Sequence, residues 1–152
     1  MIEVARIGGL DFGEKTIGVA LSDELGWTAQ GLEVVRRKTL ELDLARLGEI
    51  ARQYGVERWV VGMPRNMNGT YGPRAEATRA FVTELETKLG LPVATYDERM
   101  TTMQATRTLL EADVSRAKRK QVIDKMAAAV ILQSYMDAER IRKAREEATE
   151  RE

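Results

Sequence analysis

The chain has 152 residues, 43% of them hydrophobic and 32% charged, and its 24 basic and 24 acidic side chains balance to a formal net charge of zero. One globular domain in the cytoplasm is expected, without a membrane partner, because no apolar run is long enough to span a bilayer and charged residues interrupt the first residues where a secretory signal would be apolar. Cysteine and histidine are both absent, which excludes thiolate and imidazole metal sites and leaves oxygen-bound Mg²⁺ or Mn²⁺ as the natural metals.

The first third of the chain predicts strands. Apolar and β-branched residues fill 4–10 and 16–21, and the glycine-containing turn between them predicts an antiparallel hairpin. A third strand is expected over 32–36.

Helices and strands alternate in the rest of the chain. Apolar residues at helical spacing, with proline or glycine at several ends, predict helices over 40–54, 73–89, 101–112 and from about 115 into the charged C-terminus. Short apolar runs predict strands over 58–62 and 92–96. This order predicts an α/β fold in which three antiparallel strands and then βαβ units form a mixed five-stranded sheet flanked by helices. Residues 1–138 are expected to form the domain, and 139–152 a charged helix end or tail.

Asp11 is the first candidate site residue. It follows the first predicted strand at its C-terminal end, where sheet proteins often expose reactive groups. The alternative is a turn-capping aspartate that binds its own loop.

Asp97, Glu98 and Arg99 end the last predicted strand. Capping of the next helix by Thr101 or Thr102 would explain the segment only in part, because it leaves two acids and an arginine without a role. If the first and last strands run in the same direction, Glu98 emerges at the same sheet edge as the first candidate acid, and the two carboxylates could share a metal.

Asp124 begins an apolar stripe, since residues 127, 128, 131 and 132 share its helix face and are all apolar. A carboxylate at the border of a core needs a cation or donors. Two interpretations remain open: an ion pair with Lys120 or Lys125, or a metal ligand. Three acids on different elements favour metal-assisted phosphoryl chemistry.

Residues 62–74 form a segment with three glycines, two prolines, two arginines and no acid, directly before a predicted helix. Backbone amides, the helix N-terminus and the arginines could hold a phosphate there. An ordinary long connection is the alternative, although loops of this length in small domains are usually functional.

A basic cluster formed by Arg116, Lys118, Arg119, Lys120 and Lys125 surrounds Asp124. It is either a solvated helix face or a contact for a nucleic-acid backbone. The chain has only eight aromatic residues, and we expect none to form a stacking platform, so recognition by shape and backbone is favoured. The candidate nucleic-acid contacts are Lys15, Arg65, Asn66, Asn68, Arg74, Arg99, Lys118, Arg119, Lys120 and Lys125.

Four motifs, in this order, resemble the YqgF family, also called RuvX or the Holliday junction resolvase family. They are Asp11-Phe12-Gly13 with Ile17-Gly18-Val19-Ala20, Val60-Val61-Gly62-Met63-Pro64 with Asn66-Met67-Asn68-Gly69, Asp97-Glu98-Arg99-Met100-Thr101-Thr102, and Asp124-Lys125-Met126-Ala127-Ala128 with Ile131-Leu132-Gln133. The resemblance extends over about residues 4–137.

The resemblance implies a ribonuclease H-like fold and a nuclease that uses Mg²⁺ or Mn²⁺. Asp11, Glu98 and Asp124 match the family's catalytic, metal-binding carboxylates, and Asp97 is expected beside them rather than as a ligand. The implied substrates are the 5′ end of the small-subunit ribosomal RNA precursor or, by likeness to the RuvC resolvase, four-way DNA junctions. Thr16 stands where the family often carries arginine, which weakens a phosphate contact near Asp11.

Two other function classes stay open. The turn at Asp11 also resembles the phosphate loop of actin-like kinases and ATPases, which need two such lobes to enclose a nucleotide. A non-catalytic RNA-binding or transcription-associated module of the same fold is the second alternative. If the substrate is a four-way junction, a homodimer is expected, because paired cuts need two-fold symmetry.

Overall fold

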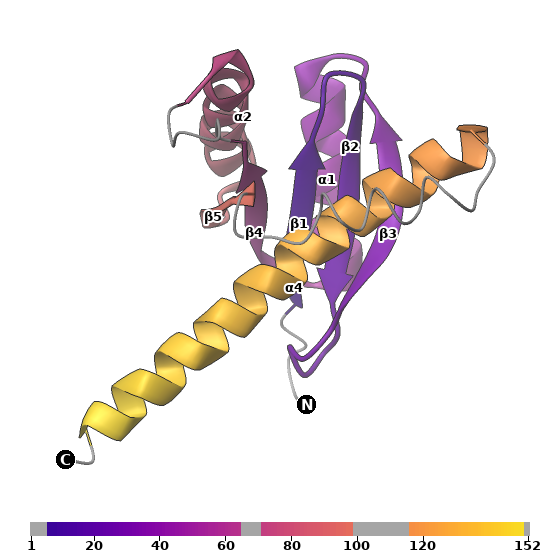
Figure 1. Cartoon of the computed structure of the whole chain (residues 1–152). Helices are drawn as coiled ribbons and strands as arrows, with labels where there is room; N and C mark the ends of the chain where they lie inside the picture. The colour runs from indigo at the N-terminus through magenta and orange to yellow at the C-terminus, as the bar shows by residue number, and fades with distance from the viewer. Residues whose placement is uncertain (1–5, 65–70, 99–115, 151–152) are drawn as a thin grey trace.

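The computed structural model describes residues 6–64, 71–98 and 116–150, with the side chains of the last segment described from 123 onward (Figure 1). The elements are β1 (Arg6–Phe12), β2 (Thr16–Ser22), β3 (Ala29–Arg36), α1 (Leu40–Tyr54), β4 (Val56–Met63), α2 (Pro73–Leu89), β5 (Val93–Asp97) and α4 (Arg116–Glu150). The helix predicted over 101–112 lies outside the described residues.

The five strands form one sheet in the order β3-β2-β1-β4-β5. β2 pairs antiparallel with β1 and with β3, whereas β4 pairs parallel with β1 and with β5. The predicted mixed sheet, with an antiparallel meander followed by βαβ units, is therefore confirmed.

Local signals set the ends of the two helices between strands. The Thr39 side chain accepts a hydrogen bond from the backbone N–H of Leu42 and caps α1, which ends at Gly55 with a φ of 69°. α2 begins at Pro73 and ends at Gly90 with a φ of 65°. Both helices have the bounds that the sequence predicts.

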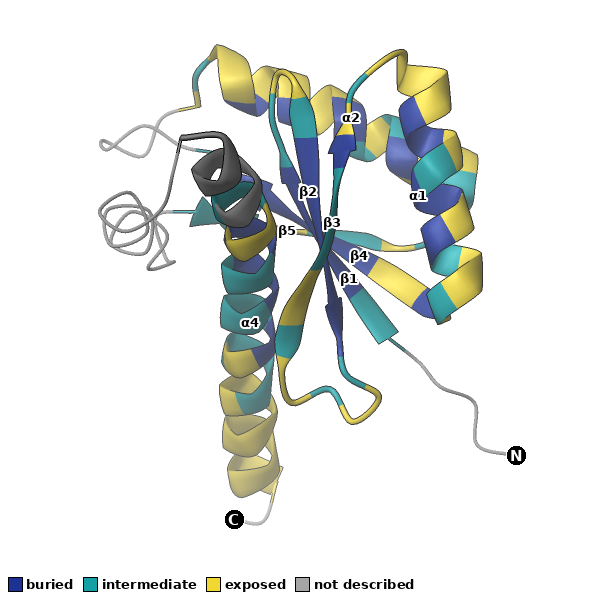
Figure 2. Ribbon diagram, turned by 90° about the vertical axis from the view of Figure 1, so that its right-hand side faces the viewer, coloured by how far each residue is buried: buried dark blue, intermediate teal, exposed yellow. Residues whose placement is uncertain are grey.

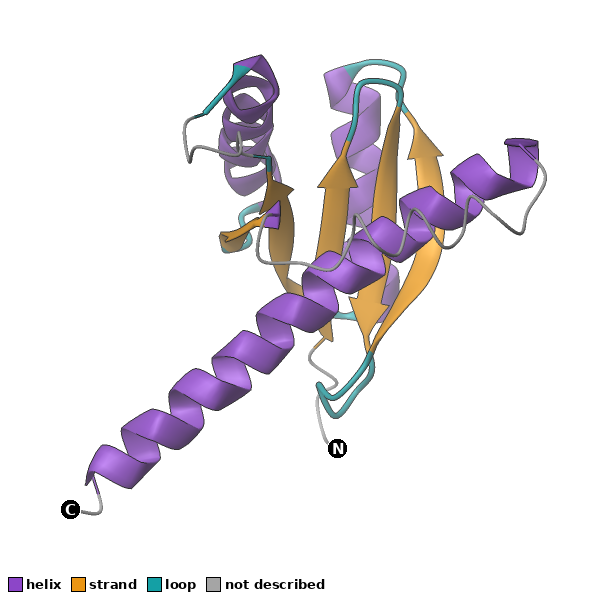
Figure 3. Ribbon diagram, in the orientation of Figure 1, coloured by secondary structure: helices purple, strands orange, loops and turns teal. Residues whose placement is uncertain are grey.

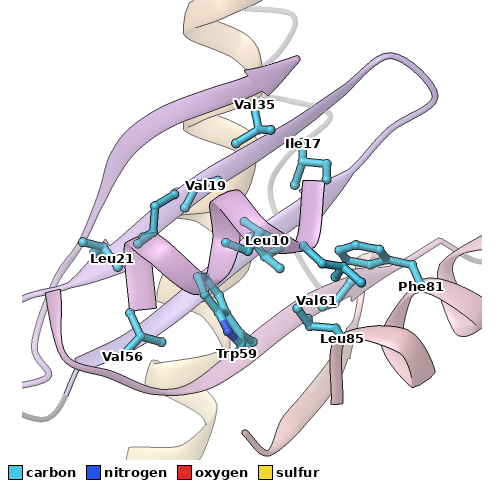
Figure 4. Packing of buried hydrophobic residues seen from close by; sticks show 13 residues of the cluster. Leu10, Ile17, Val19, Leu21, Val35, Val56, Trp59, Val61, Phe81 and Leu85 are labelled. Atoms are coloured by element: carbon cyan, nitrogen blue, oxygen red, sulfur yellow. The ribbon is translucent and has the colours of Figure 1, made fainter. Parts of the chain in front are cut away.

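Two hydrophobic cores lie on opposite faces of the sheet. α1 and α2 cover one face and α4 crosses the other (Figures 1 and 3). The first core contains Leu10, Trp59 and Val61 among other fully buried residues (Figure 4). The second forms where Ile131 and Leu132 of α4 pack on the sheet.

α4 has a docked part and an exposed part. Its inner face is buried as far as Met136, and every residue from Ile141 to Glu150 is exposed (Figure 2). The helix runs without a break through position 138, where the domain boundary was predicted. No helix in the described part of the chain is long and apolar enough to cross a membrane.

Candidate functional site

Asp11 lies inside β1 rather than after it. The prediction that it follows the strand was wrong, because antiparallel pairing continues through Asp11 opposite Gly18 and Phe12 opposite Ile17. Its side chain is buried, with 8% exposed. The backbone of this candidate acid is thereby fixed by the sheet.

Glycines flank Asp11 on both neighbouring strands. Gly18 is its partner on β2. On the other side, β4 pairs with β1 so that Val61 lies opposite Leu10, which puts Gly62 beside Asp11 one residue further along. Gly18, Asp11 and Gly62 thus form a row across β2, β1 and β4, and Asp11 is the only residue of the row that has a side chain.

This row faces α4. A Cβ on Gly9 would lie 2.7 Å from the Cβ of Leu132 in α4. Since side chains alternate along a strand, Asp11, two residues later, is on the same face as Gly9. The helix and the candidate acid therefore share one side of the sheet.

Asp124 lies over one end of the row. A Cβ on Gly18 would be 2.1 Å from the backbone oxygen of Asp124, so α4 approaches β2 as closely as only glycine permits. The Thr16 hydroxyl donates a 3.0 Å hydrogen bond to Oδ2 of Asp124. The apolar stripe predicted after Asp124 is confirmed, because residues 127, 128, 131 and 132 are all buried.

Glu98 lies over the other end. It follows β5, and a Cβ on Gly62 would be 2.9 Å from its Oε1 and 3.2 Å from its Cγ. Asp97 pairs in register with Met63, one position after Gly62, and so falls on the opposite face by alternation. That Asp97 lies beside the ligands rather than among them stays a prediction.

The three candidate acids therefore come from β1, α4 and the end of β5 to one face of the sheet, with the Asp124 backbone over Gly18 and its carboxylate at Thr16. Adjacent strands are about 4.8 Å apart, so Gly18 and Gly62 are separated by about 10 Å, with Asp11 between them. Among the described residues, no three acidic side chains are grouped closely enough to hold a metal ion together. Carboxylate oxygens are ligands that a hard cation prefers, and the metal-ligand set remains a prediction.

The predicted nucleic-acid contacts are placed only in part. Lys15, in the β1–β2 turn, is exposed near the Asp11 end of the sheet, as are Arg74 in the first turn of α2 and Lys125 next to Asp124. The side chains of Lys118, Arg119 and Lys120 in α4 are not described. Arg65, Asn66, Asn68 and Arg99 lie outside the described residues.

Sequence reasoning missed how Thr16, Gly18 and Gly62 shape the site. The sequence analysis considered two lysines as partners of Asp124 and did not consider Thr16. The hydrogen bond to Asp124 comes from the Thr16 hydroxyl on β2. The available signal was glycine inside two strands, which marks close approach of another element.

Comparisons with known proteins found a matching family model and similar sequences. A family model described as "RuvX: Holliday junction resolvase" matches residues 5–138. Two relatives carry the name "Putative pre-16S rRNA nuclease". The protein of Symbiobacterium thermophilum is 77% identical over 133 residues, which cover 88% of this chain and 92% of that one. The protein of Bacillus subtilis is 56% identical over 135 residues, which cover 88% and 98%.

Solved structures with the same fold include two resolvases. RuvC of Thermus thermophilus in complex with a Holliday junction has a TM-score of 0.56 at 16% identity and covers 88% of this chain and 96% of its own. The fowlpox virus Holliday junction resolvase has a TM-score of 0.53 at 14% identity and covers 88% and 99%. At such identities the likeness concerns the fold, and it confirms the predicted ribonuclease H-like class.

Proposed function

We propose, from the premise that the chain belongs to the RuvX family, that it is a metal-dependent endonuclease that hydrolyses phosphodiester bonds at the row formed by Asp11, Glu98 and Asp124. The observation that carries the proposal is Asp11, 8% exposed, on a strand between two glycines over which the other two acids lie.

In the proposed mechanism, Asp11, Glu98 and Asp124 would hold Mg²⁺ or Mn²⁺. Such ions, when bound, supply an activated water and stabilise negative charge at a phosphate. The Thr16 hydroxyl occupies Oδ2 of Asp124 and so fixes the orientation of the carboxylate. The β1 backbone holds Asp11 in register with both neighbouring strands.

The exposed basic residues around this sheet edge would bind the nucleic-acid backbone. Lys15, Arg74 and Lys125 are exposed, and ion pairs with phosphates need no base-specific geometry. The other predicted contacts, Arg65, Asn66, Asn68, Arg99, Lys118, Arg119 and Lys120, belong to the same proposal.

The proposed substrate is precursor ribosomal RNA, because relatives that are 56% and 77% identical carry the name "Putative pre-16S rRNA nuclease". Processing of such a precursor would place the protein in the cytoplasm. A four-way DNA junction is the second candidate, favoured by the family description, and it would require a homodimer.

The test incubates the purified protein with a labelled precursor RNA fragment and, separately, with a four-way junction, each in Mg²⁺, Mn²⁺ or EDTA. Asp124→Asn is compared with Glu147→Gln, which neutralises an exposed acid on the same helix. We expect RNA cleavage that disappears in EDTA and in Asp124→Asn while Glu147→Gln stays active. Paired junction cuts instead would establish a resolvase, and metal-independent binding without cleavage of either substrate would refute the nuclease.

A further inference from the structure

The tip of the β2–β3 hairpin exposes two large apolar side chains. Leu25 is 79% exposed and Trp27 is 59% exposed. This tip lies at the end of the sheet opposite the β1–β2 turn (Figure 1). It is therefore separate from the carboxylate row.

Hydrogen bonds within the hairpin fix the backbone on both sides of the Trp27 carbonyl. Oδ1 of Asp23 accepts hydrogen bonds from the backbone N–H groups of Trp27, at 2.7 Å, and of Thr28, at 3.1 Å. Gly26 closes the turn with a φ of 74°. The backbone of the turn that carries Trp27 is therefore held in one conformation.

α4 supports the same tryptophan from the other side of the chain. The Gln133 side chain accepts from the backbone N–H of Ala29, at 2.9 Å, and donates to the Trp27 carbonyl, at 3.0 Å. The Arg140 guanidinium carbon lies 4.9 Å from the centre of the Trp27 ring. A cation over one side of the ring holds it in place while more than half of the side chain stays open to solvent.

An open depression of about 270 Å³ lies between the hairpin tip and α4. Trp27 and Tyr135 line it together with Arg58, Arg140 and Lys143, against a single acid, Glu139, so the lining carries three positive charges and one negative charge. Arg58 donates to the Tyr135 hydroxyl at 2.9 Å, which keeps this cation beside the aromatic ring. Aromatic faces combined with cations suit stacked bases and their phosphates.

We propose that this depression, which we call the Trp27 site, binds single-stranded RNA by stacking a base on Trp27 with phosphates held by Arg58 and Lys143. The excess of positive charge favours this occupant over an apolar protein surface. Along α4 the rise from Asp124 is about 17 Å to Tyr135 and about 24 Å to Arg140, both of which line the depression. One RNA strand lying along α4 would therefore reach both the Trp27 site and the candidate carboxylates. The inference deepens the proposed function and rests on it for the choice of RNA.

The proposal revises the expectation that the aromatic residues form no stacking platform. That expectation came from their scarcity in the sequence. Trp27 and Tyr135 are brought together by the packing of α4 against the hairpin, through contacts such as Gln133 to Trp27, 106 positions apart.

The test measures the affinity of a labelled twelve-nucleotide single-stranded RNA by fluorescence anisotropy in EDTA, so that cleavage plays no part. Trp27→Ala should weaken binding by roughly 5- to 150-fold, the range for loss of one base–aromatic stack, while Trp27→Phe retains most of it. The matched control is Leu42→Ala on α1, which removes a side chain of similar exposure, 55%, on the opposite side of the sheet. A duplex of the same sequence should bind with no dependence on Trp27.

A second readout assigns the contact directly. The chain has two tryptophans, and Trp59 is fully buried, so RNA should quench the fluorescence of Trp27 in the wild type and not that remaining in Trp27→Phe. Unchanged affinity in Trp27→Ala, or binding without quenching, would overturn the proposal. So would a dimer in sedimentation that Trp27→Ala dissociates, because the surface would then join two copies.

Failure of the two proposals can be told apart. Trp27-dependent RNA binding by a protein that cleaves nothing would refute the nuclease and leave the Trp27 site standing. If cleavage requires Asp124 but the affinity for RNA is unchanged in Trp27→Ala, the Trp27 site alone is refuted.

Discussion

Replacement of Gly18 by alanine should displace the helix that carries Asp124. The added Cβ would lie 2.1 Å from the Asp124 backbone oxygen, whereas ordinary contacts begin at about 3.4 Å, so the helix must retreat by about 1.3 Å. The obstacle is backbone, which cannot rotate away as a side-chain end can. The same shift would lengthen the 3.0 Å bond from Thr16 to Asp124 beyond hydrogen-bonding distance.

The expected cost follows from this geometry. Overpacking of a tight contact costs about 1–3 kcal/mol, and each kcal/mol lowers Tm by about 2–4 °C in a domain of this size. Gly18→Ala should therefore lower Tm by about 2–12 °C in differential scanning calorimetry. Displacement of a catalytic group by about 1 Å costs about 100-fold in rate, so nuclease activity should fall by that order.

Gly62→Ala is the matched comparison on the other side of Asp11. Its Cβ would meet Cδ1 of Ile131 at 2.5 Å and Oε1 of Glu98 at 2.9 Å, both at the ends of side chains. We expect a smaller loss of Tm than for Gly18→Ala, with an equally clear loss of activity because Glu98 is pushed aside. A Gly18→Ala protein with wild-type Tm and wild-type activity would refute the close approach of α4 to β2.

Three further outcomes are expected. Thr16→Val removes the hydroxyl that donates to Asp124 while keeping the side-chain shape, and it should lower nuclease activity about tenfold, as expected for loss of a hydrogen bond to a charged group. Thr16→Ser keeps the hydroxyl and should stay near wild-type activity. Equal rates for both variants would contradict the positioning role of Thr16. Asp43→Ala should cost about 1–3 kcal/mol in urea unfolding, because this buried carboxylate pairs with an arginine and accepts a backbone N–H, and an unchanged midpoint would refute that role. The hydrogen bond from the Thr28 backbone, followed by smaller backbone contributions, lowers the pKa of Asp23 from its ordinary value of 3.8. The stabilisation that the charged Asp23 gives to the fold is therefore present above pH 3.8 and is lost as the pH falls through the lowered pKa. An NMR titration of the carboxyl group, with Asp23→Asn as reference, would check this.

Periodicity within one element was enough to predict the helix that carries Asp124 and its apolar stripe. Both depend on residues three and four apart, so they are local properties of the sequence. The bounds of α1 and α2 were predictable for the same reason, since Gly55 and Gly90 end them locally. The family motifs match the same three acids, Asp11, Glu98 and Asp124, and their catalytic role stays a prediction.

Pairing between elements could not be predicted in the same way. The end of β1 was placed too early because pairing with β2, rather than composition, carries the strand through Phe12. The contact between Thr16 and Asp124 joins residues 108 positions apart, and no spacing rule relates them. The roles of Gly18 and Gly62 likewise depend on which strands become neighbours of Asp11.

The docking of α4 on the glycines of the sheet has a consequence during protein synthesis. β1, β2 and β3 pair with neighbours in sequence, so this meander can form early, with Asp11 already in place. α4 comes last among the described elements, and until it emerges from the ribosome the nascent chain lacks Asp124 and leaves the Ala20 and Val60 face uncovered. A chain whose translation stops before α4 should therefore be inactive on nucleic acid and prone to aggregate through that apolar face.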